Sequence, residues 1–69
     1  MDIRKRFGAK LRSLREQHGW SQEEFADRAG MHRTYVSSIE RGIRNPTLSV
    51  LERLAKALGI SIAALLDKI

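Results

Sequence analysis

Four hydrogen-bonding side chains gather in a short stretch near the middle of the chain, at Arg33, Thr34, Ser37 and Ser38. A spacing of about one turn places them on one face of a helix. A guanidinium can donate two parallel hydrogen bonds to guanine O6 and N7, and a threonine offers a hydroxyl and a methyl group to a base edge. Short serine hydroxyls suit close approach or contact through water. Such a face has the chemistry to read bases in the major groove of duplex DNA.

Arg33 is the most informative of these residues. It opens its helix, where a cation is unfavourable because the helix dipole has its positive end there. An anionic or acceptor-rich partner would explain that placement. The alternative is that Arg33 is an ordinary surface residue of the first turn.

Hydrophobic spacing predicts helices throughout the chain, and no alternating run indicates a strand. A first helix carries an apolar stripe at Ile3, Phe7, Leu11 and Leu14. Gly19 follows as a natural residue to end it. Ser21 and Glu24 form the pattern of a capping box, which predicts a second helix from about Gln22 to Ala29. Gly30 then supplies the backbone freedom for a tight turn between helices.

A third helix is predicted from about Arg33 to Arg41, with His32 as a weaker cap and Gly42 at its end. Val36 and Ile39 are its expected buried residues. The third helix and the second therefore form a helix-turn-helix, in which the polar side of the third helix faces outward.

Two more helices are predicted in the last third of the chain. Thr47 caps the first of them, whose apolar side carries Leu48, Leu51, Leu54, Ala55 and Leu58. Gly59 ends that helix, and Ser61 caps a last short helix from Ile62 to about Lys68. The expected fold class is all-α, a compact five-helix bundle that forms one domain over residues 1–69.

Length and composition exclude several classes of protein. With 69 residues and no cysteine, the chain is one small domain without disulfides or thiolate metal sites. His18 and His32 are not spaced as metal ligands, so we expect no metal and no cofactor. We also expect no enzyme, since no nucleophile or phosphate-loop motif is present. No apolar run is long enough to span a bilayer. The absence of cysteine fits a reducing compartment, so we expect a cytoplasmic, nucleoid-associated protein.

A net charge of +5 favours a polyanionic partner. The basic first helix could also lie on an anionic membrane surface, although its apolar stripe is better explained as part of the core. We therefore expect no membrane partner and no small-molecule ligand.

Several short motifs together resemble one family. They are Ser-Gln-Glu-Glu-Phe-Ala, Ala-Gly-Met, Tyr-Val-Ser-Ser-Ile-Glu-Arg-Gly, Asn-Pro-Thr and Leu-Ala-Lys-Ala-Leu-Gly-Ile. In this combination, from Leu11 to Leu66, the chain resembles the phage-repressor/Cro type of helix-turn-helix DNA-binding domain. The stretch His-Arg-Thr-Tyr-Val-Ser most resembles the controller proteins of restriction–modification systems.

The resemblance, together with the helix ends, implies contacts with DNA phosphates. Gln22 opens the second helix, whose free N–H groups attract a phosphate, and the family pattern supports it as a backbone clamp. Arg44 and Asn45 follow the third helix and could contact the opposite strand, or Arg44 could enter the minor groove. Tyr35 either places its hydroxyl on a phosphate or fills the seam between the second and third helices.

The resemblance also implies an ion pair between Arg15 and Glu40, which would join the first helix to the end of the third. A buried pair would orient the third helix, because stranding one of the two charges is costly. An ordinary surface pair would have no such effect. The sequence leaves both readings open.

One short helix reads only about 4–6 base pairs, so proteins of this geometry usually dimerise on a pseudo-palindrome. The end of the chain has more apolar residues than a last helix needs to cover its neighbours. We therefore expect a dimer interface at Ile60, Ile62, Leu65, Leu66 and Ile69. The alternative is that these residues only complete the core.

Taken together, the residues predict a transcription regulator that binds duplex DNA as a homodimer on a pseudo-palindromic operator. The alternative is a protein-interaction module on the same fold, such as an antitoxin or a coactivator-like piece. Such a module should carry an acidic or apolar third helix, whereas here that face is polar and bears Arg33.

Overall fold

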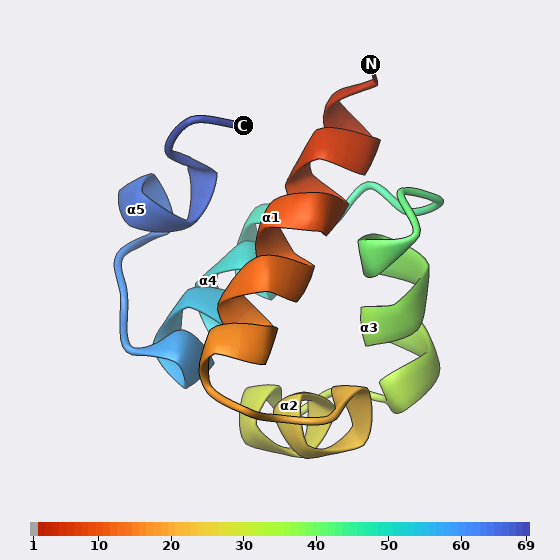
Figure 1. Cartoon of the computed structure of the whole chain (residues 1–69), viewed down its shortest axis with the longest axis vertical. Helices are drawn as coiled ribbons and strands as arrows, with labels where there is room; N and C mark the ends of the chain where they lie inside the picture. The colour runs from red at the N-terminus through yellow and green to blue at the C-terminus, as the bar shows by residue number, and fades with distance from the viewer. Residues whose placement is uncertain (1) are drawn as a thin grey trace.

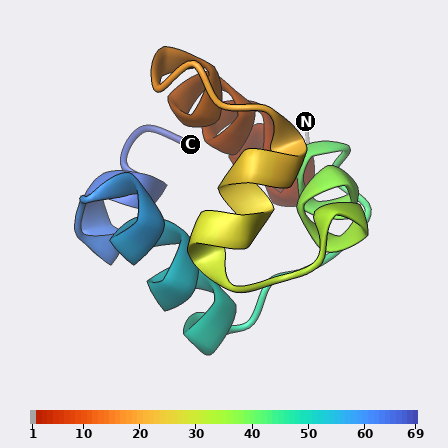
Figure 2. The same ribbon diagram turned by 90° about the horizontal axis from the view of Figure 1, so that it is seen from below.

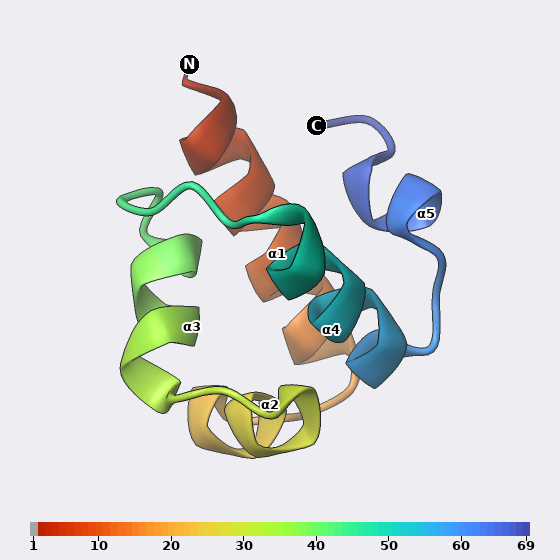
Figure 3. The same cartoon turned by 180° about the vertical axis from the view of Figure 1, so that it is seen from behind.

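The structure, a computed structural model, describes residues 2–69, and within them it contains five helices and no strand. In chain order these are α1 (Ile3–Gln17), α2 (Gln22–Ala29), α3 (Arg33–Glu40), α4 (Leu48–Leu58) and α5 (Ile62–Leu66). The predicted all-α fold is confirmed. Figure 1 shows α3 and α5 on opposite sides of the molecule, with α1 and α4 between them, and Figure 3 shows this arrangement from behind. At one end of the molecule, α2 lies between α3 and α4 (Figure 2).

Side-chain caps begin three of the helices where the sequence predicts them. Ser21, Thr47 and Ser61 each accept a hydrogen bond from the backbone N–H three residues later, at 3.0 to 3.2 Å. The capping box at Ser21 is only half formed, because the Glu24 carboxylate pairs with Arg28 instead. These bonds satisfy N–H groups that the first turn of a helix otherwise leaves without a partner.

The last helix ends two residues earlier than the sequence predicts, at Leu66 instead of Lys68. Asp67, the residue after the helix, has an extended backbone (ψ 133°), and Lys68 follows with a left-handed φ of 61°, so the helix does not continue. From α1, the Lys10 ammonium donates hydrogen bonds to the carbonyls of Ala64 and Asp67. A cation at a helix C-terminus is favourable, so Lys10 holds this short helix against α1.

The core draws residues from all five helices. Its largest fully buried side chains are Leu11, Phe25, Val36, Ile39, Leu54 and Leu65. Val36 and Ile39 therefore have the buried positions predicted for them on α3. The prediction that Leu65 belongs to a dimer interface is wrong, because the core of its own protomer leaves it no surface to offer a second chain.

A glycine lets α1 and α3 meet at close range. Gly8 is buried, and a Cβ atom placed on it would lie 2.5 Å from the carbonyl oxygen of Ile39 and 2.6 Å from that of Glu40. Any larger residue would push apart the middle of α1 and the last turn of α3. Gly8 therefore helps to set the position of α3. This helix ends at Glu40, one residue before its predicted end at Arg41.

Candidate nucleic-acid interface

α3 lies at the edge of the molecule (Figure 1), with one side in the core and the other facing outward. The outward side carries the four predicted base-reading residues, the exposed Arg33 and Thr34 and the half-buried Ser37 and Ser38. The structure thus brings all four together on one helix face. Their exposure decreases along the helix, so its N-terminal end is the part most open to a partner.

The four side chains differ in how free their hydrogen-bonding groups are. The Thr34 hydroxyl lies 2.6 Å from Nδ1 of His32, the residue that caps α3, and the Ser38 hydroxyl donates to the Thr34 carbonyl at 2.7 Å. Among residues 2–69, the guanidinium of Arg33 has no hydrogen-bond or ion-pair partner. Arg33 is therefore the strongest free donor on this face.

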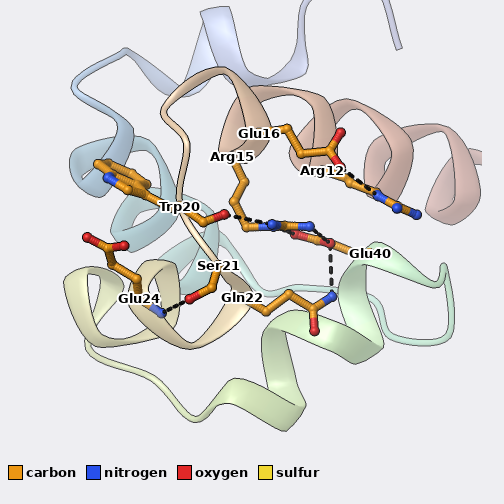
Figure 4. Close-up of polar contacts among 8 residues, drawn as sticks. All are labelled: Arg12, Arg15, Glu16, Trp20, Ser21, Gln22, Glu24 and Glu40. Atoms are coloured by element: carbon orange, nitrogen blue, oxygen red, sulfur yellow. Dashed lines mark hydrogen bonds and ion pairs between the residues drawn. The ribbon is translucent and has the colours of Figure 1, made fainter.

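A buried polar network holds α3 in place (Figure 4). Arg15 donates from Nε to Oε2 of Glu40 at 2.7 Å, from Nη2 to Oε1 at 3.0 Å, and from Nη1 to the carbonyl of Trp20 at 2.8 Å. The side chains of Arg15 and Glu40 are only 10% and 3% exposed. The reading of this ion pair as an ordinary surface contact is therefore wrong. Hydrogen bonding to Glu40 raises the pKa of Arg15, so the guanidinium stays charged.

The same network reaches the start of α2. Gln22, the first residue of α2, donates from Nε2 to Oε1 of Glu40 at 3.1 Å. Glu40 is the last residue of α3 and also pairs with Arg15 of α1, so it connects all three helices (Figure 4). One of the two amide hydrogens of Gln22 is occupied by its bond to Glu40. The second amide hydrogen of Gln22 and the backbone N–H groups of Gln22 and Glu23 remain for an anion, whereas that of Glu24 is already bonded to Ser21.

The loop after α3 carries the other predicted phosphate contacts. Arg44 and Asn45 are both exposed. The Arg44 guanidinium lies over the ring of Tyr35, with Cζ 5.1 Å from the ring centroid. Tyr35 is half-buried and packs against the core, as one of its two predicted readings has it. The structure thus brings Tyr35 and Arg44 into contact, which the sequence pattern did not indicate.

The side of the molecule formed by the N-terminus of α1, α4 and α5 has an apolar groove. Its volume is about 240 Å³, and its lining includes Ile3, Phe7, Pro46, Leu51, Leu66 and Ile69. Leu48 is 77% exposed and lies one turn before Leu51 on α4. Of the predicted dimer residues, Leu66 and Ile69 line this groove, while Ile60 and Ile62 are half-buried elsewhere against the core.

Comparison with known proteins identifies the family to which this chain belongs. The helix-turn-helix family pattern matches residues 11–65. The chain belongs to the helix-turn-helix family. Control protein C.SmaI of Serratia marcescens is 47% identical over 68 residues, which span 99% of this chain and 81% of that one. The crystal structure of the restriction-modification controller protein C.AhdI from Aeromonas hydrophila has a TM-score of 0.87 at 44% identity, covering 90% of this chain and 94% of that one.

The structure of a third similar protein was solved in complex with DNA. SinR, the master regulator for biofilm formation, in complex with DNA, has a TM-score of 0.83 at 37% identity, covering 88% of this chain and 98% of that one. The resemblance predicted from Leu11 to Leu66 is thus confirmed, including the similarity to restriction–modification controllers. In residues 2–69 no helix is long and apolar enough to cross a membrane. The same residues contain no group of three or more His, Cys, Asp or Glu side chains that could hold a metal ion.

Two cations beside the helix-turn-helix were not predicted as site residues: the sequence indicates Lys5 only as part of the basic first helix and Arg41 only as the end of the third. Lys5 lies against Gly42, since a Cβ atom on that glycine would be 2.6 Å from Lys5 Cγ. Arg41 is exposed at the end of α3, next to the same turn. Lys5 belongs to the first helix in sequence, and only the packing of α1 on α3 brings it to the loop that carries Arg44.

Proposed function

We propose that this helix-turn-helix protein is a sequence-specific transcription regulator that binds duplex DNA as a homodimer on a pseudo-palindromic operator. We further propose that it serves a restriction–modification system in the cytoplasm, like the control proteins it resembles. The observation that carries the proposal is the outward face of α3. There an unpaired Arg33 lies beside Thr34, and a buried ion pair fixes the helix behind them.

Base reading is assigned to this face. Arg33 has all its donors free and projects from the exposed end of α3, so it is placed to donate two hydrogen bonds to a guanine. Thr34 is placed to present its methyl group, because its hydroxyl already contacts His32. Ser37 and Ser38 are less exposed and suit contacts through water.

Phosphate contacts are assigned to both sides of α3. The Gln22 side chain and the N–H groups of Gln22 and Glu23 offer donors on one side, while Arg44 and Asn45 offer donors on the other. The net charge of +5 supports such contacts, because neutralising phosphates releases counterions.

Self-association is assigned to the apolar groove. Leu48 lies between Pro46 and Leu51, which both line the groove, so a twofold axis near this point would let each protomer place its Leu48 in the groove of the other. A contiguous apolar patch is typical of an interface, and the exposed Leu48 lies one helical turn from the groove-lining Leu51. The interface proposed here uses Leu48, Leu66 and Ile69, with Ile60 and Ile62 at its border.

Selection of bound fragments from a random duplex pool tests the DNA-binding part of the proposal. We expect enriched duplexes with two inverted half-sites about one helical turn apart. Enriched sites without dyad symmetry would contradict binding as a dimer. A failure to enrich any sequence would contradict DNA recognition and favour a protein-interaction module instead.

Sedimentation at micromolar concentration tests the interface. Leu48→Glu should shift the dimer to monomer, because it places a charge in an apolar contact. Ile43→Glu is the matched control, since Ile43 is 56% exposed but does not line the groove. A wild-type chain that stays monomeric, or equal effects of the two variants, would remove this interface.

A further inference from the structure

We infer that Tyr35 is a positioning residue for Arg44: its aromatic ring holds the Arg44 guanidinium in the conformation that contacts a DNA phosphate. The inference rests on the proposed function and adds a residue whose effect on binding is exerted through its neighbour. It assigns the ring of Tyr35 a role separate from that of its hydroxyl.

The geometry is that of a cation held over an aromatic face. Cζ of Arg44 lies 5.1 Å from the centroid of the Tyr35 ring, within the range of about 6 Å in which the ring quadrupole attracts a cation. Among residues 2–69, Arg44 has no carboxylate partner that would compete for the guanidinium. The aromatic ring is therefore the contact that orders this exposed side chain.

Tyr35 is fixed on its other side. It lies in the first turn of α3, is half-buried, and packs against the core. The loop backbone before Arg44 is also fixed, because the N–H of Gly42 donates to the Ile39 carbonyl and the N–H of Ile43 donates to the Ser38 carbonyl, both at 3.0 Å. Both ends of the Arg44 side chain are therefore held: its backbone follows a hydrogen-bonded turn, and its guanidinium lies over the Tyr35 ring.

The contact with the ring leaves the donors of Arg44 available. The attraction is between the cation and the ring face and uses no conventional hydrogen bond, so the five N–H bonds of the guanidinium stay free for a phosphate. An arginine that is ordered before DNA arrives loses less conformational freedom on binding. Ordering one flexible side chain at an interface weakens affinity by roughly two- to tenfold.

Two substitutions separate the ring from the hydroxyl. Tyr35→Phe keeps the ring and should bind DNA within about twofold of wild type, since the attraction between the cation and the ring face persists. Tyr35→Leu removes the ring and should weaken binding by roughly two- to tenfold. In an Arg44→Ala background the same Tyr35→Leu change should have an effect of less than about twofold, because the pair is already broken.

The experiment is a double-mutant cycle on a duplex enriched by the wild-type chain, with dissociation constants measured by fluorescence anisotropy at several salt concentrations. Leu14→Ala is the control for lost packing, because Leu14 is partly buried against the same core but lies on α1. NMR of the DNA-free chain gives an independent readout. Arg44 side-chain protons should show a ring-current shift in wild type and Tyr35→Phe that is absent in Tyr35→Leu.

The outcomes distinguish the inference from the function on which it rests. If wild type binds the duplex but Tyr35→Leu weakens binding equally with and without Arg44, Tyr35 does not act through Arg44. If Tyr35→Phe loses as much affinity as Tyr35→Leu, the hydroxyl and not the ring is the important group. A wild-type chain that binds no duplex, while the ring-current shift is present, would refute the proposed function and leave the contact intact.

Discussion

Glu40→Gln should destabilise the helix-turn-helix strongly, because it removes the carboxylate that pairs with the buried guanidinium of Arg15. The two side chains share hydrogen bonds of 2.7 and 3.0 Å and are almost fully enclosed. Glutamine has nearly the same shape as glutamate, so the packing is kept, but the charge is lost and one accepting oxygen is replaced by an NH2 group that faces donors of Arg15 or Gln22. Stranding one member of a buried pair costs about 3–5 kcal/mol. The free energy of unfolding of a domain of this size is roughly 3–10 kcal/mol. The loss would therefore remove a large part of it and leave the variant only marginally stable.

A urea titration followed by tryptophan fluorescence and circular dichroism measures this loss. Trp20 is the single tryptophan of the chain, and its carbonyl accepts a hydrogen bond from Arg15, so its emission reports on the network. The unfolding midpoint should fall while the slope stays constant, since the folded structure exposes the same surface on unfolding.

Glu16→Gln is the matched control for this prediction. Glu16 pairs with Arg12 at 3.3 Å across one helical turn, and both side chains are exposed. Breaking such a pair costs only about 0.3–0.5 kcal/mol. Equal losses from Glu40→Gln and Glu16→Gln would refute the reasoning, because burial would then have no bearing on what the ion pair contributes.

Three further predictions follow from single contacts. Gly8→Ala should lower both stability and DNA affinity, because the added methyl would lie 2.5 Å from the Ile39 carbonyl oxygen; a variant as stable as wild type in urea would contradict this. Hydrogen bonds from Arg4 lower the pKa of Asp2 to about 2, so its cap of α1 should stabilise the fold above about pH 4 and be lost as the pH falls toward 2. The stability difference between wild type and Asp2→Ala, followed by urea titration, should shrink over that interval and stay constant above it. Lys10→Met should speed hydrogen exchange in α5 and leave α3 unchanged, since only α5 loses its C-terminal donor.

Local patterns were enough to predict most of the fold. The N-caps at Ser21, Thr47 and Ser61 act within one turn, so the starts of their helices could be read directly from the residue types. The end of α5 could not, because it depends on Lys10, a residue more than fifty positions away in the chain. Glu24 shows a second limit: its choice between the cap and Arg28 is a competition between two nearby partners.

The site was predicted in part for the same reason. The outward face of α3 follows from helical periodicity, whereas the contact of Tyr35 with Arg44 depends on how the loop folds back. Burial of the Arg15–Glu40 pair could not be inferred, since the two residues are 25 positions apart and only packing closes them off from water. Leu65 shows the converse error: an apolar residue near the chain end looks like interface until the core around it is known.

Affinity of Arg33→Lys for the duplex that wild type selects is the most direct test of the central claim, that α3 reads base sequence through Arg33. Lysine keeps the charge but loses the planar fork that donates two parallel bonds to guanine. We predict a loss of about 1–3 kcal/mol on the selected duplex, a flattened preference at one base pair of each half-site, and little change on unrelated DNA. Lysine binding as tightly and as selectively as arginine would contradict the claim and reduce Arg33 to a phosphate contact.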